Sequence, residues 1–163
     1  MQGEASTRTV EPWSIIMYRD GFYILARQLE EEALRLFAVE RISDIRLLRG
    51  EEFSVPRDFD PQAAFEHHLG LWRTDRSPER VVVAFDTAVA HSVRARQWKG
   101  FESYEEASDG RLLLIMKVTV TPEIVSWVLG WGALAEVLEP MHLRQQVAEQ
   151  VHASASRYEG VQA

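Results

Sequence analysis

The 163-residue chain contains no cysteine, which excludes a disulfide framework, a thiolate metal site and a cysteine nucleophile. A reducing cytoplasm is consistent with this absence, and we expect the protein to be found there. No apolar run approaches the roughly 20 residues that a membrane-spanning helix requires. The N-terminal stretch MQGEASTRTVEP lacks the basic start and the apolar centre of a signal peptide. We therefore expect no association with a membrane.

Positive charge is also scarce, since 18 basic residues face 25 acidic ones and the net charge is −7. This balance excludes a protein that binds nucleic acid over its whole surface, but it allows a local basic patch. Lys99 and Lys117 are the only lysines, so almost all the basic residues are arginines. Arginine binds planar anions in a bidentate way, although a GC-rich genome produces the same bias.

Motifs for catalysis and for metal binding are missing as well. The serines do not form a nucleophile elbow, and there is no glycine-rich phosphate loop. Two of the five histidines, His67 and His68, are adjacent, and adjacent residues on a helix diverge by about 100°. We expect no enzymatic activity, no metal site and no cofactor.

The first fifty residues are rich in β-branched and aromatic side chains, which favour strands. The pattern predicts a tight turn at Asp20-Gly21, and it treats Glu30 to Glu32 as a solvated acidic connection. Four strands are expected, over residues 10–18, 22–27, 34–39 and 42–48. A meander of this kind predicts a small barrel, which would usually have a fifth strand.

The rest of the chain alternates between strand and helix patterns. Asp60 and Pro61 predict the start of a short helix that ends near Leu69. The elements expected after it are a strand over 81–85, a helix capped by Asp86 to about Gln97, strands over 101–107 and 112–120, a helix starting at Thr121-Pro122-Glu123, a strand over 135–138 and a final helix from Pro140. Leu143, Val147 and Val151 form an apolar stripe on that final helix.

The element order βαββαβ with a terminal helix predicts an α+β layer, with helices on one face of an antiparallel sheet. The fold class is therefore α+β, with a small Sm/SH3-like β-barrel followed by this module. We divide the chain into a barrel (1–52), a helical linker (53–80) and an α+β extension (81–163).

The stretch GFYILARQ (21–28) shows which side chains share a face, because successive side chains of a strand alternate. Phe22, Ile24 and Ala26 form a wholly apolar set that we place in the core. Tyr23 and Arg27 share the other face. Arg35, Phe37, Val39 and Arg41 are alternate residues, so on a strand they would share one face, with the two arginines at its ends. Arginines beside aromatics can bind phosphates while bases stack, although a solvated face with ordinary arginines is the commoner case.

The stretches TVEPWSIIMYRDGFYILARQ and LRLFAVERISDIRLL resemble the WYL domain of bacterial transcriptional regulators. The family motifs fall on Val10 to Trp13, on Phe22-Tyr23-Ile24 and on Arg35 to Ile42, in the usual order. The later stretches VVVAFDTAVA and VTPEIVSWVLGWGALAEVLEPMHLRQQVAEQV resemble the C-terminal extension of these regulators, the WCX domain.

The resemblance implies an effector-sensing barrel, some relatives of which bind single-stranded DNA or nucleotides on a basic patch, and an extension that helps to form a homodimer. The implied ligand-binding residues are Arg8, Trp13, Tyr23, Arg27, Arg35 and Arg41. Family members usually carry an N-terminal helix-turn-helix, for which the ten residues before Glu11 leave no room. The first barrel strand is also expected to be missing.

Two departures from the family pattern bear on ligand binding. Phe22 and Ile24 replace Trp and Leu, which are mild changes. Ala38 stands where the inner strand of the family has arginine, and this puts anion binding in doubt. Arg27 is the candidate to replace that arginine.

Two further hypotheses stay open beside the effector sensor. The chain could be an interaction module without a ligand, which dimerises or pairs with an intact regulator through the last helix and an exposed Trp98 or Trp131. It could instead be an enzyme or hold a small-molecule pocket between the two modules, at the junction near Trp72.

Overall fold

The computed structural model describes residues 5–72, 74 and 76–160, and the chain divides into two compact units, Met1–Ala64 and Phe65–Ala163. The division lies inside the stretch 53–80 that we expected to be a linker. Each unit has an antiparallel sheet of its own.

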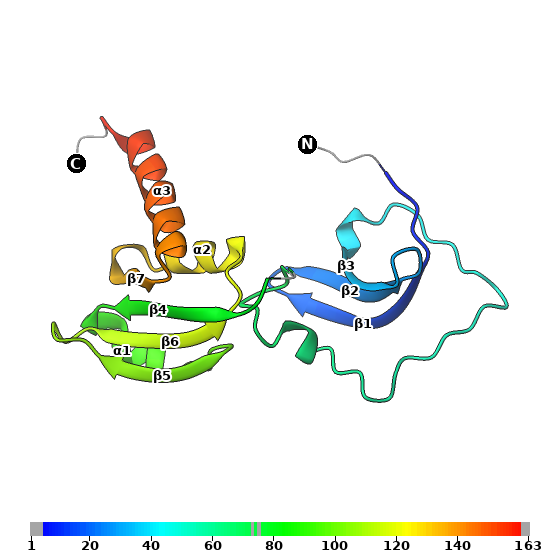
Figure 1. Ribbon diagram of the computed structural model, residues 1–163. Helices are drawn as coiled ribbons and strands as arrows, with labels where there is room; N and C mark the ends of the chain where they lie inside the picture. Colours follow the sequence, from blue (N-terminus) through cyan, green and yellow to red (C-terminus); the bar gives the residue numbers. More distant parts are fainter. Residues whose placement is uncertain (1–4, 73, 75, 161–163) are drawn as a thin grey trace. The chain divides into compact units, whose positions relative to one another are not determined.

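The first unit is built on a three-stranded sheet in the order β1-β2-β3 (Figure 1). The strands are β1 (Val10–Tyr18), β2 (Gly21–Gln28) and β3 (Ala33–Ala38), followed by the short 3-10 helix η1 (Val39–Arg41). These three strands were predicted, but the turn at Asp20-Gly21 was not placed correctly. Tyr18 pairs with Gly21, so Arg19 and Asp20 form the turn, and Arg19 adopts a φ of 51°.

The predicted fourth strand over residues 42–48 is wrong, and the sheet does not close into a barrel. This segment has no strand conformation, and Ile45 and Leu47 are 80% and 82% exposed. Its alternating apolar residues suit a strand, but a strand also needs a neighbour with which to share hydrogen bonds. Within the described residues no other strand pairs with it.

The predicted helix after Asp60 is reduced to one 3-10 turn, η2 (Ala63–Phe65). The predicted capping role of Asp60 is seen, because its Oδ1 accepts a hydrogen bond from the Gln62 backbone N–H at 2.8 Å. Phe65 is buried.

The second unit confirms the βαββαβ order with a terminal helix. Its elements are β4 (Glu79–Phe85), α1 (Thr87–Arg94), β5 (Phe101–Glu106), β6 (Leu112–Val118), α2 (Pro122–Leu129), η3 (Gly132–Leu134), β7 (Ala135–Glu139) and α3 (Met141–Tyr158). The sheet order is β5-β6-β4-β7, and every neighbouring pair is antiparallel.

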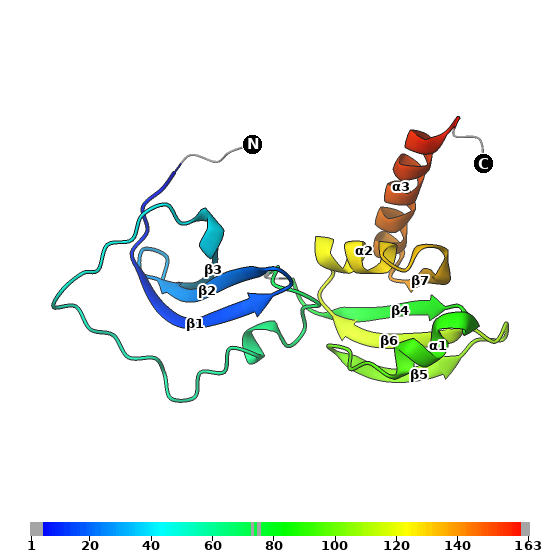
Figure 2. The same cartoon turned by 180° about the vertical axis from the view of Figure 1, so that it is seen from behind.

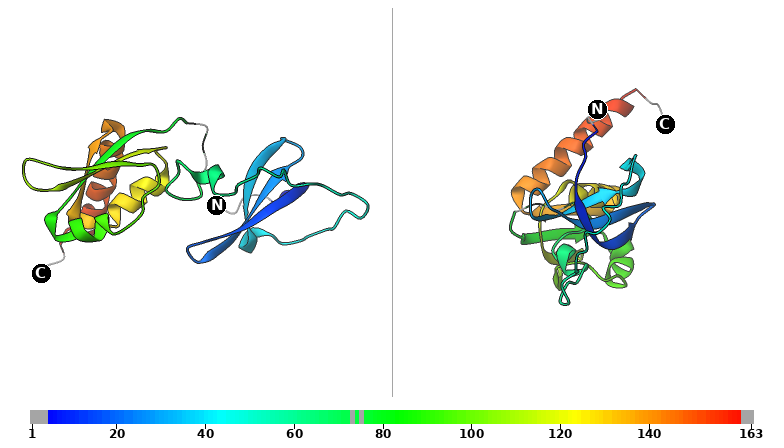
Figure 3. Two further views of the ribbon diagram at one scale, coloured as in Figure 1. Left: turned by 90° about the horizontal axis from the view of Figure 1, so that it is seen from below. Right: turned by 90° about the vertical axis from the view of Figure 1, so that its right-hand side faces the viewer.

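One face of this sheet and the helices enclose the core of the second unit. Figure 2 shows α1 lying against the strands, and in the left view of Figure 3 both α1 and α2 lie on the same side of them. Alternate residues of the two central strands supply the sheet side of the core, namely Val81, Val83, Phe85, Leu112, Leu114, Met116 and Val118. They pack against Val93 of α1 and against Ile124 and Val128 of α2.

An aromatic cluster extends this core. Phe85 meets Trp127 and Trp131 edge to face, with ring centroids 6.0 and 5.1 Å away, and Trp98 meets Trp127 at 5.3 Å. The Nε1 of Trp98 donates to the Val93 carbonyl at 2.9 Å. Trp98 and Trp131 are therefore partly buried against the core.

Local capping signals set the starts of the helices. Asp86 accepts from the Ala88 backbone N–H at 2.8 Å as the predicted N-cap of α1, and α1 ends at Arg94, before Gln97. Pro122 stands in the first turn of α2, as predicted. In α3, Leu143 is fully buried and Val147 packs against the core, whereas Val151 is 50% exposed. The apolar stripe thus runs beyond the body of the unit.

Candidate ligand-binding face

Strand register decides which of the predicted ligand-binding residues share a face of the first sheet. Tyr23 lies opposite Ala38, and Arg27 lies opposite both Leu34 and Glu11. Alternate residues of a strand project to the same side, so Tyr23 and Arg27 of β2 share one face. Their directly opposed partners on β1 and β3 project to that side as well. We call it the Tyr23 face.

Arg35 lies on the opposite face. It pairs in register with Ala26, and Phe37 pairs with Ile24. Of the apolar set placed in the core, Ala26 is fully buried, but Phe22 is 55% exposed, so its predicted burial is wrong. Leu25 on the Tyr23 face is fully buried as well. In this open sheet the middle of β2 is therefore buried on both faces, at Leu25 and Ala26, whereas Phe22 near the turn is exposed.

The turn after β2 neutralises part of the basic set. Arg35 donates from Nε to Glu31 at 2.9 Å, and Arg27 lies 3.9 Å from Glu32 and 3.4 Å from Glu11. Glu30 accepts from the Thr9 backbone N–H at 2.8 Å. The sequence predicts a solvated connection at Glu30 to Glu32. In the structure each of the three carboxylates meets a partner on a neighbouring segment.

The same contacts change the acidity of two of these carboxyls. The hydrogen bond from Arg35, together with its charge, lowers the pKa of Glu31 below the usual glutamate range. The backbone hydrogen bond from Thr9 lowers the pKa of Glu30, and the charge of Arg8 contributes to a smaller extent. Both groups are therefore firmly ionised at neutral pH, and they hold negative charge beside Arg8 and Arg35.

Trp13 is half-buried in the first unit. It stands at a β-bulge between Pro12 and Ser14, and its ring meets Phe59 edge to face with centroids 4.9 Å apart. Its Nε1 is buried, with no hydrogen-bond partner among the described residues. A ring held in this way supports the irregular segment after β3, and it is less accessible to a stacked base than the sequence suggested.

Arg41 differs from the other arginines of the predicted set. It is the last residue of η1, three positions beyond Ala38, and its side chain is exposed. Within the described residues no carboxylate forms an ion pair with it. Arg8 forms no ion pair there either, but its charge acts on the carboxylates of Glu30 and Glu31, so Arg41 is the cation of the predicted set with the least competition for a phosphate.

Arg27 does not stand where the missing arginine would be. Ala38 lies opposite Tyr23, and Arg27 lies four residues further along β2 on the same face, about 13 Å away for an ideal strand. Its guanidinium also faces Glu11 and Glu32. The loss at position 38 is therefore not compensated at the same place on the sheet.

Two family models match this chain, and they do so in the expected order. The model described as WYL domain matches residues 1–47, and the model described as WCX domain matches residues 77–155. The chain carries a WYL domain followed by a WCX domain. The three-stranded sheet belongs to the WYL domain, and the four-stranded sheet with its helices belongs to the WCX domain.

Known proteins resemble both domains together. The chain is 24% identical over 160 residues to a protein named "Uncharacterized HTH-type transcriptional regulator YobV" from Bacillus subtilis (strain 168). The match covers 96% of this chain and 49% of the relative, so the chain spans about half the length of that protein. Proteasome accessory factor B/C of Arthrobacter aurescens gives a TM-score of 0.45 at 20% identity, over 99% of this chain and 24% of that one.

The WYL–WCX chain has no helix, within the described residues, that is long and apolar enough to cross a membrane. The described residues likewise contain no group of three or more histidine or carboxylate side chains that could hold a metal ion.

Proposed function

We propose that this chain is the effector-sensing part of a helix-turn-helix transcriptional regulator and that it acts in the cytoplasm. The observation that carries the proposal is the ordered match of a WYL and a WCX domain. The regulator name of the Bacillus subtilis relative supports it, and both families are regulatory. The role requires no catalysis, and we propose none.

The proposed effector is anionic, either single-stranded DNA or a nucleotide, and it binds on the Tyr23 face. Arg41 would contact a phosphate first, and Tyr23 offers a ring and a hydroxyl on the Tyr23 face. Arg27 would join only when a phosphate displaces Glu11 and Glu32. Arg8 and Trp13 stay in the proposed set with smaller roles, and Arg35, which lies on the opposite face, would contribute through its charge alone. The neighbouring carboxylates would hold the affinity down, so that only a ligand with several phosphates binds well.

Signalling would follow from a shift between dimer geometries, one of which the ligand favours. The proposed dimer contact is the outer half of α3. From Ala148 to Tyr158 every residue of this helix is exposed, and Figure 1 shows it extending away from the sheet. An isolated helix of this length is marginal in water. Val151 and Tyr158 continue the apolar stripe there, and a second copy of the chain would cover it.

The ligand proposal is tested by titrating short single-stranded DNA at increasing salt concentrations. Binding should weaken as salt rises, because phosphate contacts release counterions. Arg41→Gln should weaken it further, whereas Arg94→Gln, which removes the same charge from α1, should not. Absence of binding even at low salt would contradict the nucleic-acid version.

A ligand-free interaction module is the second candidate function. The ion pairs of Glu31 with Arg35 and of Glu11 with Arg27 favour it, because they satisfy cations that a ligand would need. This candidate predicts dimerisation without any response to DNA, so the titration and a measurement of oligomeric state separate the two.

A further inference from the structure

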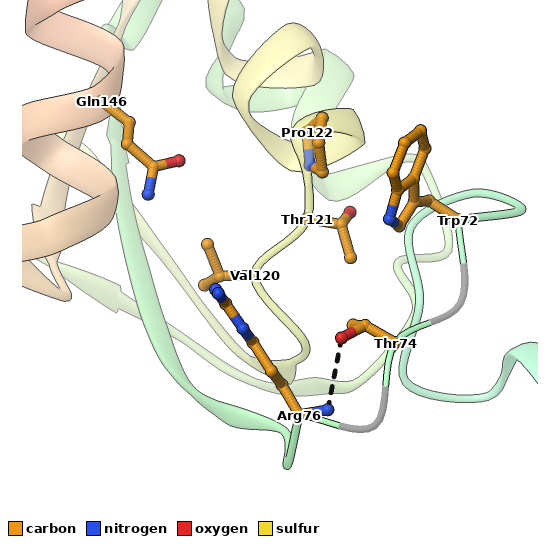
Figure 4. Close-up of a pocket in the computed structure, with 7 residues that line it drawn as sticks. All are labelled: Trp72, Thr74, Arg76, Val120, Thr121, Pro122 and Gln146. Atoms are coloured by element: carbon orange, nitrogen blue, oxygen red, sulfur yellow. Dashed lines mark hydrogen bonds between the residues drawn. The ribbon is translucent and has the colours of Figure 1, made fainter.

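A cavity of about 260 Å³ lies in the second unit, where the segment around Trp72 passes the start of α2. Figure 4 shows side chains from three parts of the unit around it. Trp72, Thr74 and Arg76 come from the segment before β4, Thr121 stands at the start of α2, and Gln146 comes from α3. These five residues carry an aromatic ring, a cation, two hydroxyls and an amide.

Backbone hydrogen bonds hold the Trp72 wall in place. The carboxylate of Glu123 in α2 accepts from the backbone N–H groups of Leu71 and Trp72, at 3.0 and 2.8 Å. Gly70 permits this approach, because a Cβ at that position would clash with the Glu123 carboxyl atoms. The charge of Glu123 is thereby engaged, while the Trp72 side chain stays 57% exposed at the cavity.

The hydroxyl of Thr121 lacks a partner. Thr121 is only 3% exposed, and its Oγ1 is buried without a hydrogen-bond partner among the described residues. It occupies the N-cap position of α2, where a threonine hydroxyl usually accepts a backbone hydrogen bond, but it makes no such bond. A buried hydroxyl left unpaired is uncommon and unfavourable. Thr121 lies between Trp72 and Val120 in Figure 4, on the wall of the cavity.

Arg76 supplies positive charge on another side of the cavity. Its side chain runs from the strand side toward the space below Gln146 in Figure 4. The described part of the chain contains no carboxylate that forms an ion pair with it. A guanidinium binds phosphate or carboxylate oxygens in a bidentate way, and an exposed indole offers a flat apolar surface.

We propose that this cavity binds a small planar ligand that carries one anionic group, a phosphate or a carboxylate. The ring would lie against Trp72, and the anion would meet Arg76. The Thr121 hydroxyl, which is buried from solvent as it stands, would rotate about its Cα–Cβ bond to hydrogen-bond to the ligand. The volume is below the range of typical drug-sized pockets, so the cavity admits a mononucleotide or a smaller molecule and not an oligonucleotide. This site is separate from the Tyr23 face and does not depend on it.

The test is isothermal titration of the full chain with adenosine monophosphate and, separately, with benzoate. At least one probe should bind, and the better one identifies the anionic group. Arg76→Gln and Thr121→Val should each weaken that binding by about tenfold or more. Arg94→Gln removes the same charge elsewhere in the second unit and should leave binding unchanged, as should Arg41→Gln on the first unit.

Thr119 provides the matched control for Thr121. Its Oγ1 is also buried without a partner among the described residues, but it does not line the cavity. Both Thr→Val changes remove an unpaired hydroxyl at nearly constant volume, so both variants should unfold at the same or a higher temperature. Only Thr121→Val should lose binding. The proposal is overturned if neither probe binds at millimolar concentration, if Thr119→Val loses binding equally, or if Thr121→Val unfolds at a lower temperature.

Discussion

Tyr23 and Ala38 are direct cross-strand partners on β2 and β3, so the tyrosine ring stands beside a methyl group. The resemblance to the WYL family implies an arginine at the position of Ala38. The Tyr23 face therefore keeps its aromatic residue but lacks a cation next to it, and Arg27, which is the candidate to replace it, stands four residues away and faces two glutamates.

Restoring that cation should strengthen DNA binding. Ala38→Arg is expected to tighten binding of single-stranded DNA by about tenfold at low salt, and to steepen the salt dependence by about one phosphate contact. Ala33→Arg is the control. Ala33 pairs with Gln28, which lies on the face opposite to Tyr23, so this substitution adds the same charge to the opposite face. Equal gains in both variants, measured by fluorescence anisotropy, would show that overall charge alone acts and would remove the Tyr23 face from the proposal.

Removing the carboxylates that compete for arginine should have a related effect. The double variant Glu31→Gln, Glu32→Gln frees Arg35 from its partner at 2.9 Å and removes the farther of the two carboxylates that face Arg27, at 3.9 Å, while Glu11 stays in place. We expect DNA to bind severalfold more tightly at low salt. The control is the double variant Glu102→Gln, Glu105→Gln on β5, which changes the net charge by the same amount in the second unit and should leave DNA binding unchanged. The ligand-free alternative gains support if neither pair alters binding.

The contact between α3 and β7 should make the WCX domain sensitive to acid. Glu136 accepts from Arg111 Nη1 at 2.6 Å and pairs with Arg144 at 2.6 Å, and Arg144 also donates to the Val137 carbonyl at 2.7 Å. These hydrogen bonds, that of Arg111 first, lower the pKa of Glu136 below the ordinary value of 4.5. The stabilisation is complete above that value and is lost as pH falls through the lower folded-state pKa.

Glu136→Gln should therefore reduce the free energy of unfolding at neutral pH by about 1 kcal/mol or less, since the side chain is partly exposed to solvent. Below about pH 4.5 the difference between wild type and variant should shrink. Asp109, whose pKa is lowered mainly by the Arg111 backbone N–H, titrates in both proteins and cancels in the comparison. Thermal melts at several pH values measure the effect, and a constant difference across the acid range would contradict it.

The proposed dimer contact is tested by charge on the outer part of α3. Val151→Glu places a carboxylate on the apolar stripe, and sedimentation equilibrium should show a weaker dimer by tenfold or more, or about 1.4 kcal/mol. Ser156→Glu adds the same charge about 140° around the helix and should leave the dimer intact. A wild-type chain that stays monomeric at high micromolar concentration would exclude this contact.

Local signals predicted much of the fold. Asp86 starts α1 through a hydrogen bond two residues away, and Pro122 stands in the first turn of α2 with a preset φ, so the sequence is sufficient to place these helix starts. The strand predicted over residues 42–48 failed because strand formation depends on a neighbour distant in sequence, and the alternation of Ile45 and Leu47 carries no information about one.

The candidate site was harder to predict for the same reason. Strand parity correctly grouped Tyr23 with Arg27, but only the register of β2 and β3 shows that Arg35 lies on the other face. The pairing of Glu31 with Arg35 arises from the geometry of the turn between these strands. The unpaired hydroxyl of Thr121 has no sequence signal, since its position looks like an ordinary helix cap. The six ligand-binding residues remain a prediction.

The contact of Trp13 with Phe59 gives the WYL domain an optical probe of its own. The other four of the five tryptophans follow residue 65 and belong to the second unit. The difference in tryptophan fluorescence between the wild type and Trp13→Phe is the emission of Trp13. It therefore reports on the first unit alone, within the intact chain. Because the indole packs against Phe59, its wavelength and quenching should change when the segment from Ile42 to Phe59 moves. Effector binding on the sheet could then be followed without attaching a dye.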